Sequence, residues 1–265
     1  MKLSSKIFCS HDPNKFLKFF NYKTKPKNEK KYIINGKYQR FFYKCRICGH
    51  FYSKLNFKIS KLYSKQYLNL TYKNTDGIEK RFNQITNLAK KKSDNKNRAE
   101  RVNNYFIKKN LTLLDVGSGI GVFIYEMRKR KWNVRGIELD KRYADFCKKK
   151  HKLNVYQKNL SKFNLRNKFD LVTLNKVLEH VFDPIKLLKL SSKFLKKKGV
   201  LYIEVPDVKA SNEGKNRQEF CIDHLHVFSK YSLDILAKKS GLQTLLCNRI
   251  KEPSGKYTIY AFLKK

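Results

Sequence analysis

The sequence lacks any long apolar run. No stretch among its 265 residues approaches the roughly 20 apolar residues that a membrane-spanning helix requires. The N-terminus also has no apolar block of the kind found in a secretory signal, so we expect a cytoplasmic protein. Cysteine is scarce as well: six scattered cysteines are too few for a disulfide framework in a chain of this size. We therefore expect reduced thiols or a metal site.

Acidic residues are few relative to basic ones. The 21 Asp and Glu face 61 Lys and Arg, which gives a formal net charge of +40. Such a positive field would attract nucleic acid, anionic lipid surfaces or phosphorylated metabolites. However, only 12 of the basic residues are arginine, and Lys, Asn and Ile are abundant together, as a low-GC coding bias would produce. Both explanations stay open: compositional bias, or a functional basic surface.

Enough apolar material is present for a folded protein. Hydrophobic residues make up 41% and aromatic residues 14% of the chain, which excludes wholesale disorder. Residues 1–73, with three cysteines and short alternating segments, indicate a small β-rich region. Residues 74–110 have a helical period and indicate a helical connector. In residues 111–265, short apolar runs alternate with helical patterns, which is typical of a sheet with crossover helices.

The third stretch predicts an α/β fold with seven strands. We expect a mostly parallel sheet that ends in an antiparallel hairpin at 242–250 and 257–263. Helices are expected between the strands, and one of them begins at Asp183-Pro184, since proline is well tolerated at the first helical position. The apolar period of this helix extends to Leu195, and Gly199 is expected to end it.

The sharpest local signal is the segment Asp115-Val116-Gly117-Ser118-Gly119-Ile120-Gly121, which follows the first strand of this sheet. Glycines permit positive φ angles and let a ligand approach bare backbone at the start of the next helix. Dinucleotide-binding folds prefer Gly-x-Gly-x-x-Gly, which leaves room for a pyrophosphate. Here the spacing is Gly-x-Gly-x-Gly and an acid precedes it, so the segment favours a ligand with an ammonium group.

A second acid supports a nucleoside-like ligand. Glu138 ends the second strand, 17 residues after Gly121, where a carboxylate can accept both hydroxyls of an adenosine ribose. After the third strand, the side-chain amide of Asn159 could hydrogen-bond the adenine amino group. A nucleoside joined to an amino acid fits these features. The alternative is that the glycines merely form a tight turn and the acids are surface groups.

At these residues the sequence resembles the class I S-adenosylmethionine-dependent methyltransferases, over about residues 99–265. The motifs that carry the likeness are the glycine segment, Gly136-Ile137-Glu138-Leu139-Asp140, Phe169-Asp170-Leu171-Val172, Leu178-Glu179-His180-Val181-Phe182-Asp183-Pro184 and Asp223-His224-Leu225-His226-Val227-Phe228-Ser229. The resemblance implies a Rossmann-like seven-stranded sheet and S-adenosyl-L-methionine as cofactor. The residues that it places near this cofactor are Asp115, Gly117, Ser118, Gly119, Gly121, Glu138, Leu139, Asn159, Leu160 and Asn175. The family usually has Asp at the position of Asn159.

The N-terminal cysteines extend the likeness. Cys45-Arg46-Ile47-Cys48-Gly49 can place two thiolates on one metal, and structural zinc takes four ligands. A branch of these methyltransferases that includes sugar-nucleotide C-methyltransferases is similar in opening with two zinc-binding Cys-x-x-Cys pairs. In this chain the first pair is reduced to Cys9-Ser10-His11. The resemblance therefore implies a zinc-ribbon-like region with Cys9, His11, Cys45 and Cys48 as ligands and His50 as a spare; a knuckle without metal is the alternative.

Histidines are the natural source of a base for a hydroxyl or carbon acceptor. His180 follows the fourth strand, and His224 and His226 follow the fifth, on the sheet edge where ligands bind in such folds. His151 is expected to be solvated. In the similar sugar C-methyltransferases, histidines at the places of His180 and His224 lie at the acceptor site, with an acid at the place of Asp223. These three are the candidate catalytic residues, and a structural hydrogen bond is the alternative for His224.

The leading hypothesis is a methyltransferase with a small, anionic acceptor, such as a nucleotide-linked or phosphorylated sugar. An RNA-directed methyltransferase that uses the basic surface is the first rival, and it predicts binding that weakens steeply with salt. The second rival is a non-catalytic module that binds the cofactor, or a partner through its zinc knuckle.

Overall fold

A seven-stranded sheet forms the centre of the protein in the computed structural model, which describes residues 6–9, 12–26, 29, 34–59, 75–108 and 110–265. Its strands are β6 (Thr112–Val116), β7 (Asn133–Glu138), β8 (Asn154–Gln157), β9 (Phe169–Asn175), β10 (Leu195–Pro206), β12 (Gln243–Lys251) and β13 (Tyr257–Lys264). Their order is β12-β13-β10-β9-β6-β7-β8. The five strands from β10 to β8 run parallel, while β13 is antiparallel to β10 and β12. The predicted fold class is therefore confirmed.

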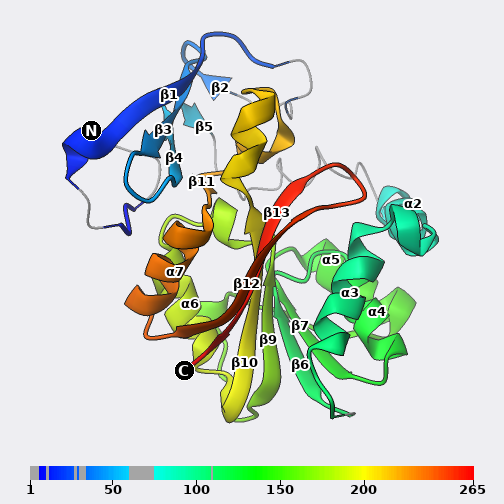
Figure 1. Ribbon diagram of the computed structural model, residues 1–265. Helices are drawn as coiled ribbons and strands as arrows, with labels where there is room; N and C mark the ends of the chain where they lie inside the picture. Colours follow the sequence, from blue (N-terminus) through cyan, green and yellow to red (C-terminus); the bar gives the residue numbers. More distant parts are fainter. Residues whose placement is uncertain (1–5, 10–11, 27–28, 30–33, 60–74, 109) are drawn as a thin grey trace.

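Helices cover both faces of this sheet (Figure 1). One face carries α2 (Thr75–Thr86), α3 (Asp94–Asn104), α4 (Val122–Lys129) and α5 (Lys141–His151), and the other carries α6 (Pro184–Ser192) and α7 (Lys230–Lys239). Alternate residues of one strand face opposite layers: Leu113 packs with α3 and α4, whereas Leu114 packs with α6. Burial on both faces explains why the parallel strands read as nearly continuous apolar runs. No helix in these described ranges combines the length and apolar character needed to cross a membrane.

Short 3-10 helices occupy several connections. They are η1 (Pro13–Lys15), η2 (Lys90–Lys92), η3 (Leu160–Lys162), η4 (Leu178–His180), η5 (Val208–Glu213) and η6 (Gln218–Phe220). Polar side chains cap the N-termini of α3, α5, α6 and α7. Asp183 accepts a hydrogen bond from the backbone of Lys186 ahead of α6, and Ser229 caps α7 in the same way.

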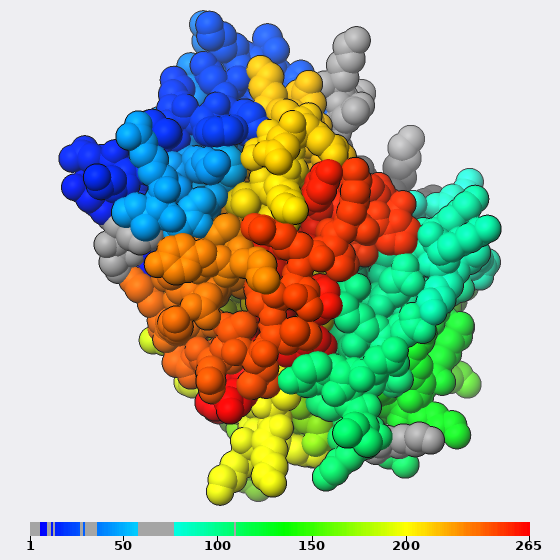
Figure 2. All heavy atoms as spheres, in the orientation of Figure 1, coloured from blue at the N-terminus to red at the C-terminus, as the bar shows by residue number. Residues whose placement is uncertain are grey.

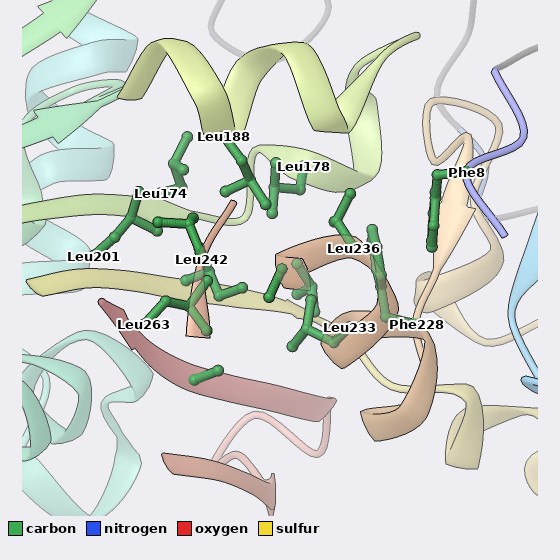
Figure 3. Packing of buried hydrophobic residues seen from close by; sticks show 14 of the residues in the cluster. Phe8, Leu174, Leu178, Leu188, Leu201, Phe228, Leu233, Leu236, Leu242 and Leu263 are labelled. Carbon is green, nitrogen blue, oxygen red and sulfur yellow. The ribbon is translucent and has the colours of Figure 1, made fainter. Parts of the chain in front are cut away.

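The larger of the apolar clusters lies under α6 and α7. Figure 3 shows Leu188 of α6 and Leu233 and Leu236 of α7 against the sheet, with Phe228 and Phe8 at the far end of the same cluster. Phe8 comes from the N-terminal region, and its ring stacks on that of Phe228 with centroids 6.1 Å apart. The N-terminal region is therefore packed onto the main sheet's helical layer.

A second sheet joins the N-terminal region to residues 226–227. Its strands are β1 (Phe16–Tyr22), β3 (Arg40–Cys45), β4 (Phe51–Leu55) and β11 (His226–Val227), in the order β1-β3-β4-β11. All neighbours in this sheet are antiparallel. A separate pair, β2 (Ile34–Asn35) and β5 (Lys58–Ile59), lies beside it. Because β11 begins two residues after His224, the N-terminal sheet is built onto the segment that carries the candidate base.

The helix expected to run from Pro184 to Gly199 is shorter than predicted. It ends at Ser192, and Leu195 already belongs to β10, where it pairs with Phe169 of β9. The register of β10 shifts between Leu195 and Val200, so that the lysines between them are exposed. Gly199 lies in this irregular stretch. A side chain at this position would come within 2.7 Å of the Phe169 carbonyl oxygen, so only glycine fits there. The glycine therefore permits a close strand contact and does not end a helix.

Candidate donor and acceptor sites

The glycine loop follows β6 and leads into α4. Gly117, Gly119 and Gly121 have φ angles of +78°, +54° and +80°, which side chains other than glycine rarely adopt. At two of them space is also restricted: an added Cβ would lie 2.8 Å from Val177 Cγ2 at Gly117 and 2.7 Å from Cys147 Sγ at Gly121. At Gly119 an added Cβ would meet no atom within 4 Å. The loop therefore depends on glycine for its path, and its centre has open space beside it.

Glu138, at the end of β7, holds this loop through its carboxylate. Its Oε2 accepts a hydrogen bond from the backbone N–H of Gly119 at 2.7 Å, and its Oε1 accepts from Leu139 and Asp140 at 2.7 and 2.9 Å. Burial raises the pKa of Glu138, and these backbone bonds oppose the rise. Three of about four lone-pair positions on the carboxylate are thus in use. A ribose with two hydroxyls would have to share or displace the Gly119 bond.

Asp115, at the end of β6, is buried among neutral donors. Its Oδ1 accepts hydrogen bonds from Thr173 Oγ1 at 2.6 Å and from Asn175 Nδ2 at 2.9 Å. Burial raises the pKa of Asp115 to about 7, although both hydrogen bonds lower it. A carboxylate in such a place is stabilised in its charged form when a cationic ligand binds beside it. This is the arrangement that the sequence analysis inferred for an ammonium group.

Polar atoms around the loop lack partners within the described part of the chain. They include Ser118 Oγ and Asn175 Oδ1. Buried polar atoms are nearly always hydrogen-bonded, so orphaned ones in one place indicate a missing ligand or water. Gly136 of β7 makes room for Ser118, because a Cβ at that position would lie 2.7 Å from Ser118 Oγ. The donor set fits a polar ligand that covers the loop.

The residues expected at the adenine end lie on the third connection of the sheet. Asn159 caps η3, and its Oδ1 accepts hydrogen bonds from the backbone N–H and the hydroxyl of Ser161, both at 2.9 Å. Leu160 is buried, whereas Leu139 is 55% exposed. An exposed leucine beside the ribose-binding position is available to cover a ring. The oxygen of Asn159 is already used locally, which leaves its NH₂ group as the donor for a ligand.

His180, which ends η4 after β9, and His224, which precedes β11, lie in contact. Their rings meet edge to face with centroids 4.8 Å apart. His180 Nδ1 bonds the Asp223 carbonyl oxygen at 2.9 Å, and His224 Nδ1 bonds that of Glu219 at 2.8 Å. Because a carbonyl oxygen only accepts, each Nδ1 carries the proton and each Nε2 is the basic nitrogen when the ring is neutral. This is the tautomer required of a base that acts through Nε2.

Glu179 is a site residue that the sequence analysis quoted within a motif but did not single out. Its carboxylate is fully buried, and in the described ranges neither oxygen has a hydrogen-bond partner. One oxygen lies within 4.8 Å of ring nitrogens of His180 and His224. Burial raises its pKa, and the charge of His180 opposes this rise. Its position in the Leu-Glu-His segment, one residue before a candidate base, was the available signal.

Asp223 also lies close to His224. An oxygen of its carboxylate, Cys221 Sγ and a ring nitrogen of His224 lie within 4.8 Å of one another. Asp223 is 3% exposed. The structure therefore brings together all three residues proposed for catalysis, and it adds Glu179 and Cys221 to the group.

His226 points the opposite way from His224. Its Nδ1 lies 3.0 Å from His50 Nε2, and its Nε2 lies 3.1 Å from the Val181 carbonyl oxygen. His50 Nδ1 in turn lies 3.1 Å from Ser232 Oγ. Burial lowers the pKa of His226 to about 3. Both histidines are thus tied into a closed network between β4, β11 and α7, and His50 has no ring nitrogen available as a spare metal ligand.

Three cysteines converge in the N-terminal region. The sulfur atoms of Cys9, Cys45 and Cys48 lie within 4.8 Å of one another, and all three residues are buried. The Cys45-to-Cys48 turn closes with a hydrogen bond from Gly49 N to the Cys45 carbonyl oxygen at 2.9 Å. A hydrogen bond with Cys9 raises the pKa of the Cys48 thiol, and burial raises it further. The three thiols suit a soft divalent metal; the fourth expected ligand, His11, lies outside the described residues.

Two other ionisable side chains have structural roles: His151, which was expected to be solvated, and Glu204. His151 is half-buried and stacks on Phe82 with ring centroids 3.9 Å apart. Glu204, in β10, is fully buried and forms a two-point ion pair with Arg98 of α3. Arg98 holds the pKa of Glu204 well below its usual range against the effect of burial. This acid stabilises the packing of α3 on the sheet.

The strand order, the glycine loop after β6 and the acids at the ends of β6 and β7 define the Rossmann-like fold of class I methyltransferases. The chain belongs to the family described as "Methyltransferase domain", whose profile matches residues 81–246, more than half of the chain.

Curated relatives and solved structures agree with this family. Ubiquinone biosynthesis O-methyltransferase of Pelagibacter ubique (strain HTCC1062) is 38% identical over 100 residues, which cover 36% of this chain and 42% of that protein. The protein of the same name from Actinobacillus pleuropneumoniae serotype 7 (strain AP76) is 31% identical over 114 residues, 39% of this chain and 47% of that one. The match thus spans less than half the length of these relatives.

Among solved structures, the glycopeptide N-methyltransferase MtfA complexed with S-adenosyl-L-methionine has a TM-score of 0.54 at 12% identity, covering 64% of this chain and 93% of that chain. A SAM-dependent methyltransferase from Aquifex aeolicus has a TM-score of 0.51 at 18% identity, covering 71% and 98%. At these identities the likeness shows the fold.

Proposed function

We propose that the protein transfers a methyl group from S-adenosyl-L-methionine to a small-molecule acceptor. The observation that carries this proposal is the bare-backbone loop at Gly117–Gly121, held between the buried carboxylate of Asp115 and the carboxylate of Glu138. Membership of the methyltransferase domain family supports it. In this proposal residues 111–265 form the cofactor-binding domain, 74–110 a helical connector and 1–73 a small zinc-binding region.

In this proposal each residue of the donor side would have its own task. The cofactor would supply a methyl group on a cationic sulfur, next to an amino acid group and an adenosine. Asp115 would pair with the ammonium group, since it is buried with only neutral donors bonded to its Oδ1. Glu138 would bind the ribose hydroxyls, and the orphaned Ser118 Oγ and Asn175 Oδ1 would gain partners. Leu139, Leu160 and the NH₂ group of Asn159 would contact the adenine.

On the acceptor side we propose His224 as the base and His180 as its neighbour in the same site. A hydroxyl or carbon acceptor must lose a proton, and a positioned histidine contributes roughly 10²- to 10⁴-fold to such a step. The carboxylates of Glu179 and Asp223 lie close enough to stabilise a protonated imidazole. Together with the name of the curated relatives, O-methyltransferase, this favours a hydroxyl as the accepting group.

The acceptor that we propose is anionic, such as a nucleotide-linked or phosphorylated sugar. The net charge of +40 supports this, because a positive surface raises the local concentration of anionic small molecules. Nucleic acid remains the competing partner for such a surface, and the two differ in their dependence on salt.

We also propose a structural zinc ion on Cys9, Cys45 and Cys48, with His11 as the fourth ligand. The convergence of three buried sulfur atoms supports it. Thiolate ligands would order the turn at Cys45–Cys48 and contribute directly to folding, as structural zinc does in small domains. A site with four protein ligands has no open position for chemistry.

Calorimetry with S-adenosylmethionine and with its demethylated product tests the donor side. We expect binding by the unmodified protein and by Asp145→Asn, which neutralises an exposed acid of α5. Binding should be lost or greatly weakened in Glu138→Gln. Incubation of cell-extract metabolites with methyl-labelled cofactor then identifies the acceptor by a mass gain of one methyl group. Absence of any heat with either ligand, from folded protein, would refute the proposal.

A further inference from the structure

A pocket of about 410 Å³ lies between the N-terminal sheet and the segment that follows β10. One wall comes from Glu29 and Arg40, and the other from Lys215, Asn216, Gln218 and Cys221. Figure 2 shows the segment around residues 207–220, in yellow, packed beside the blue N-terminal region. The volume lies within the range that small-molecule sites occupy, about 300 to 1,000 Å³.

The charged groups around this pocket differ in how far the fold already uses them. Arg40 is 1% exposed: its guanidinium donates to Glu29 Oε1 at 2.5 Å, to Tyr38 Oη at 2.7 Å and to the Phe220 carbonyl oxygen at 2.7 Å. These bonds use three of the five N–H groups of an arginine. Because Glu29 lines the same pocket and forms a buried ion pair with Arg40, the two charges offset each other, and Arg40 contributes a rigid N–H donor to the wall.

The other two cations complete the electrostatic character of the pocket. Arg217 is committed to Glu213 and Glu219 through ion pairs of 2.9 and 2.8 Å. Lys215 is exposed; its ammonium group donates a long hydrogen bond, 3.3 Å, to the Asn21 carbonyl oxygen and lies 5.7 Å from the centroid of the Tyr22 ring. Its ammonium group can turn toward a ligand at little cost. The amides of Asn216 and Gln218 add neutral donors and acceptors suited to hydroxyl groups.

The inner wall of the pocket reaches the candidate base. Cys221 lines the pocket, and its Sγ lies within 4.8 Å of a ring nitrogen of His224. His224 in turn contacts His180, which follows the strand that ends in Asn175 beside the donor loop. Cys221 therefore lies at the pocket wall and also beside the proposed base.

We propose that this pocket receives the anionic end of the methyl acceptor, a phosphate or carboxylate group, with Lys215 as its mobile cation and Arg40, paired with Glu29, as a fixed N–H donor. The accepting hydroxyl then extends past Cys221 toward His224. This inference rests on the proposed function, since it assigns a binding site to the acceptor of that reaction. It also predicts that anions bind in the absence of the methyl donor, so it can fail independently.

Thiol labelling tests the anion site without the donor. Cys221 and Cys247 are the two half-buried cysteines and the other four are buried, so alkylation of Cys221 by iodoacetamide reports on the pocket while Cys247, on β12, is an internal control. We expect inorganic phosphate and pyrophosphate, but not chloride at equal ionic strength, to slow labelling of Cys221 alone. In Lys215→Gln the anion concentration for half-protection should rise about tenfold, and in Lys209→Gln, an exposed lysine of η5, it should not change. Equal protection in both variants, or none in the unmodified protein, overturns the proposal.

Steady-state kinetics with the acceptor found in the extract distinguish an acceptor site from a separate anion site. Lys215→Gln should raise the KM for the acceptor about tenfold with little change in kcat, because the lysine binds a part of the molecule remote from the reacting atoms. The KM for the methyl donor should stay constant. If anions protect Cys221 but the acceptor KM is unchanged in Lys215→Gln, the pocket is not part of the acceptor site and the inference is wrong. Failure of donor binding would instead refute the proposed function.

Discussion

The carboxyl edge of the main sheet and the junction between β4 and β11 both bury ionisable side chains, but in opposite ways. At the sheet edge, Asp115 and Glu179 are buried carboxylates, and the oxygens of Glu179 have no hydrogen-bond partner within the described residues. At the junction, His50 and His226 bond each other, and Ser232 and a backbone carbonyl complete the network. Closed polar networks stabilise a fold, whereas unsatisfied buried groups indicate a place for a ligand. From this contrast we expect the sheet edge to bind a ligand and the junction to stabilise the fold.

The two histidines on either side of Leu225 provide the strongest test of this comparison. His224→Asn should lower kcat by about 100-fold or more and leave donor affinity and Tm nearly unchanged, because the residue lies at the edge of the site. His226→Asn should do the reverse: it leaves His50 without its partner and lowers the free energy of unfolding by roughly 1–3 kcal/mol. Kinetics and thermal unfolding of both variants measure this. Normal turnover in His224→Asn would remove it from the mechanism.

Asp115→Asn tests whether the buried charge of Asp115 lowers the stability of the fold but strengthens binding of the donor. We expect donor affinity to fall by about 10- to 100-fold, since a charge-assisted contact of about 1.5–3 kcal/mol is lost. The free energy of unfolding of this variant should be higher than that of the parent above neutral pH. The folded-state pKa of Asp115 is raised to about 7, so the stability it contributes is present at low pH and is lost as pH rises through 7. The neutral variant should therefore have a higher Tm than the parent at pH 8; a lower Tm there would contradict this explanation.

The pH dependence of donor binding tests whether Asp115 must be charged to bind the donor. Below about pH 7 Asp115 is protonated in the free protein, and it must lose this proton to pair with an ammonium group. Affinity for the demethylated product should therefore fall roughly eightfold between pH 7.5 and pH 6. The raised pKa of Glu138 acts in the same direction. Calorimetry across this range checks the slope, and Asp115→Asn should flatten most of it.

Of these changes, loss of the proposed N-terminal zinc should have the smallest effect on the affinity for the methyl donor. Removing zinc with a chelator, or Cys45→Ser, should lower Tm by about 5 °C or more, because a structural metal contributes to folding. Donor affinity should change by less than about twofold. Metal analysis of the purified protein would show one zinc per chain. A chain that holds no zinc and has the same Tm in chelator would show that the three thiols pack without metal.

Local features of the donor side were readable from the sequence because spacing along a strand and its following loop fixes them. The three glycines, Asp115 and Glu138 are each at the strand end expected for them. The helix after Pro184 was overestimated because the leucines up to Leu195 continue an apolar helical period. Pairing of Leu195 with Phe169 in a neighbouring strand overrides that period.

The acceptor side was harder to predict because it is assembled from distant segments. His180 and Asp223 are 43 residues apart in the chain and meet through a side chain to backbone hydrogen bond. Leu225 N donates to the Glu179 carbonyl oxygen at 2.7 Å, which brings Glu179 and His224 into one site. His224 precedes β11, whereas His226 lies in it and bonds His50. These contacts between distant segments have no local sequence signal, whereas the two-residue spacing did predict that His226 points away from His224.

The two-residue strand β11 links the acceptor loop to the N-terminal sheet. His226 and Val227 pair with Tyr52 and Phe51, and Ser53 N donates to the Leu225 carbonyl oxygen at 3.0 Å. The donor loop has no part in this pairing. If the proposed function is correct, we expect mutations in β3 and β4 to change the choice of acceptor with little effect on donor binding, which would give such a protein a route to new substrates during evolution.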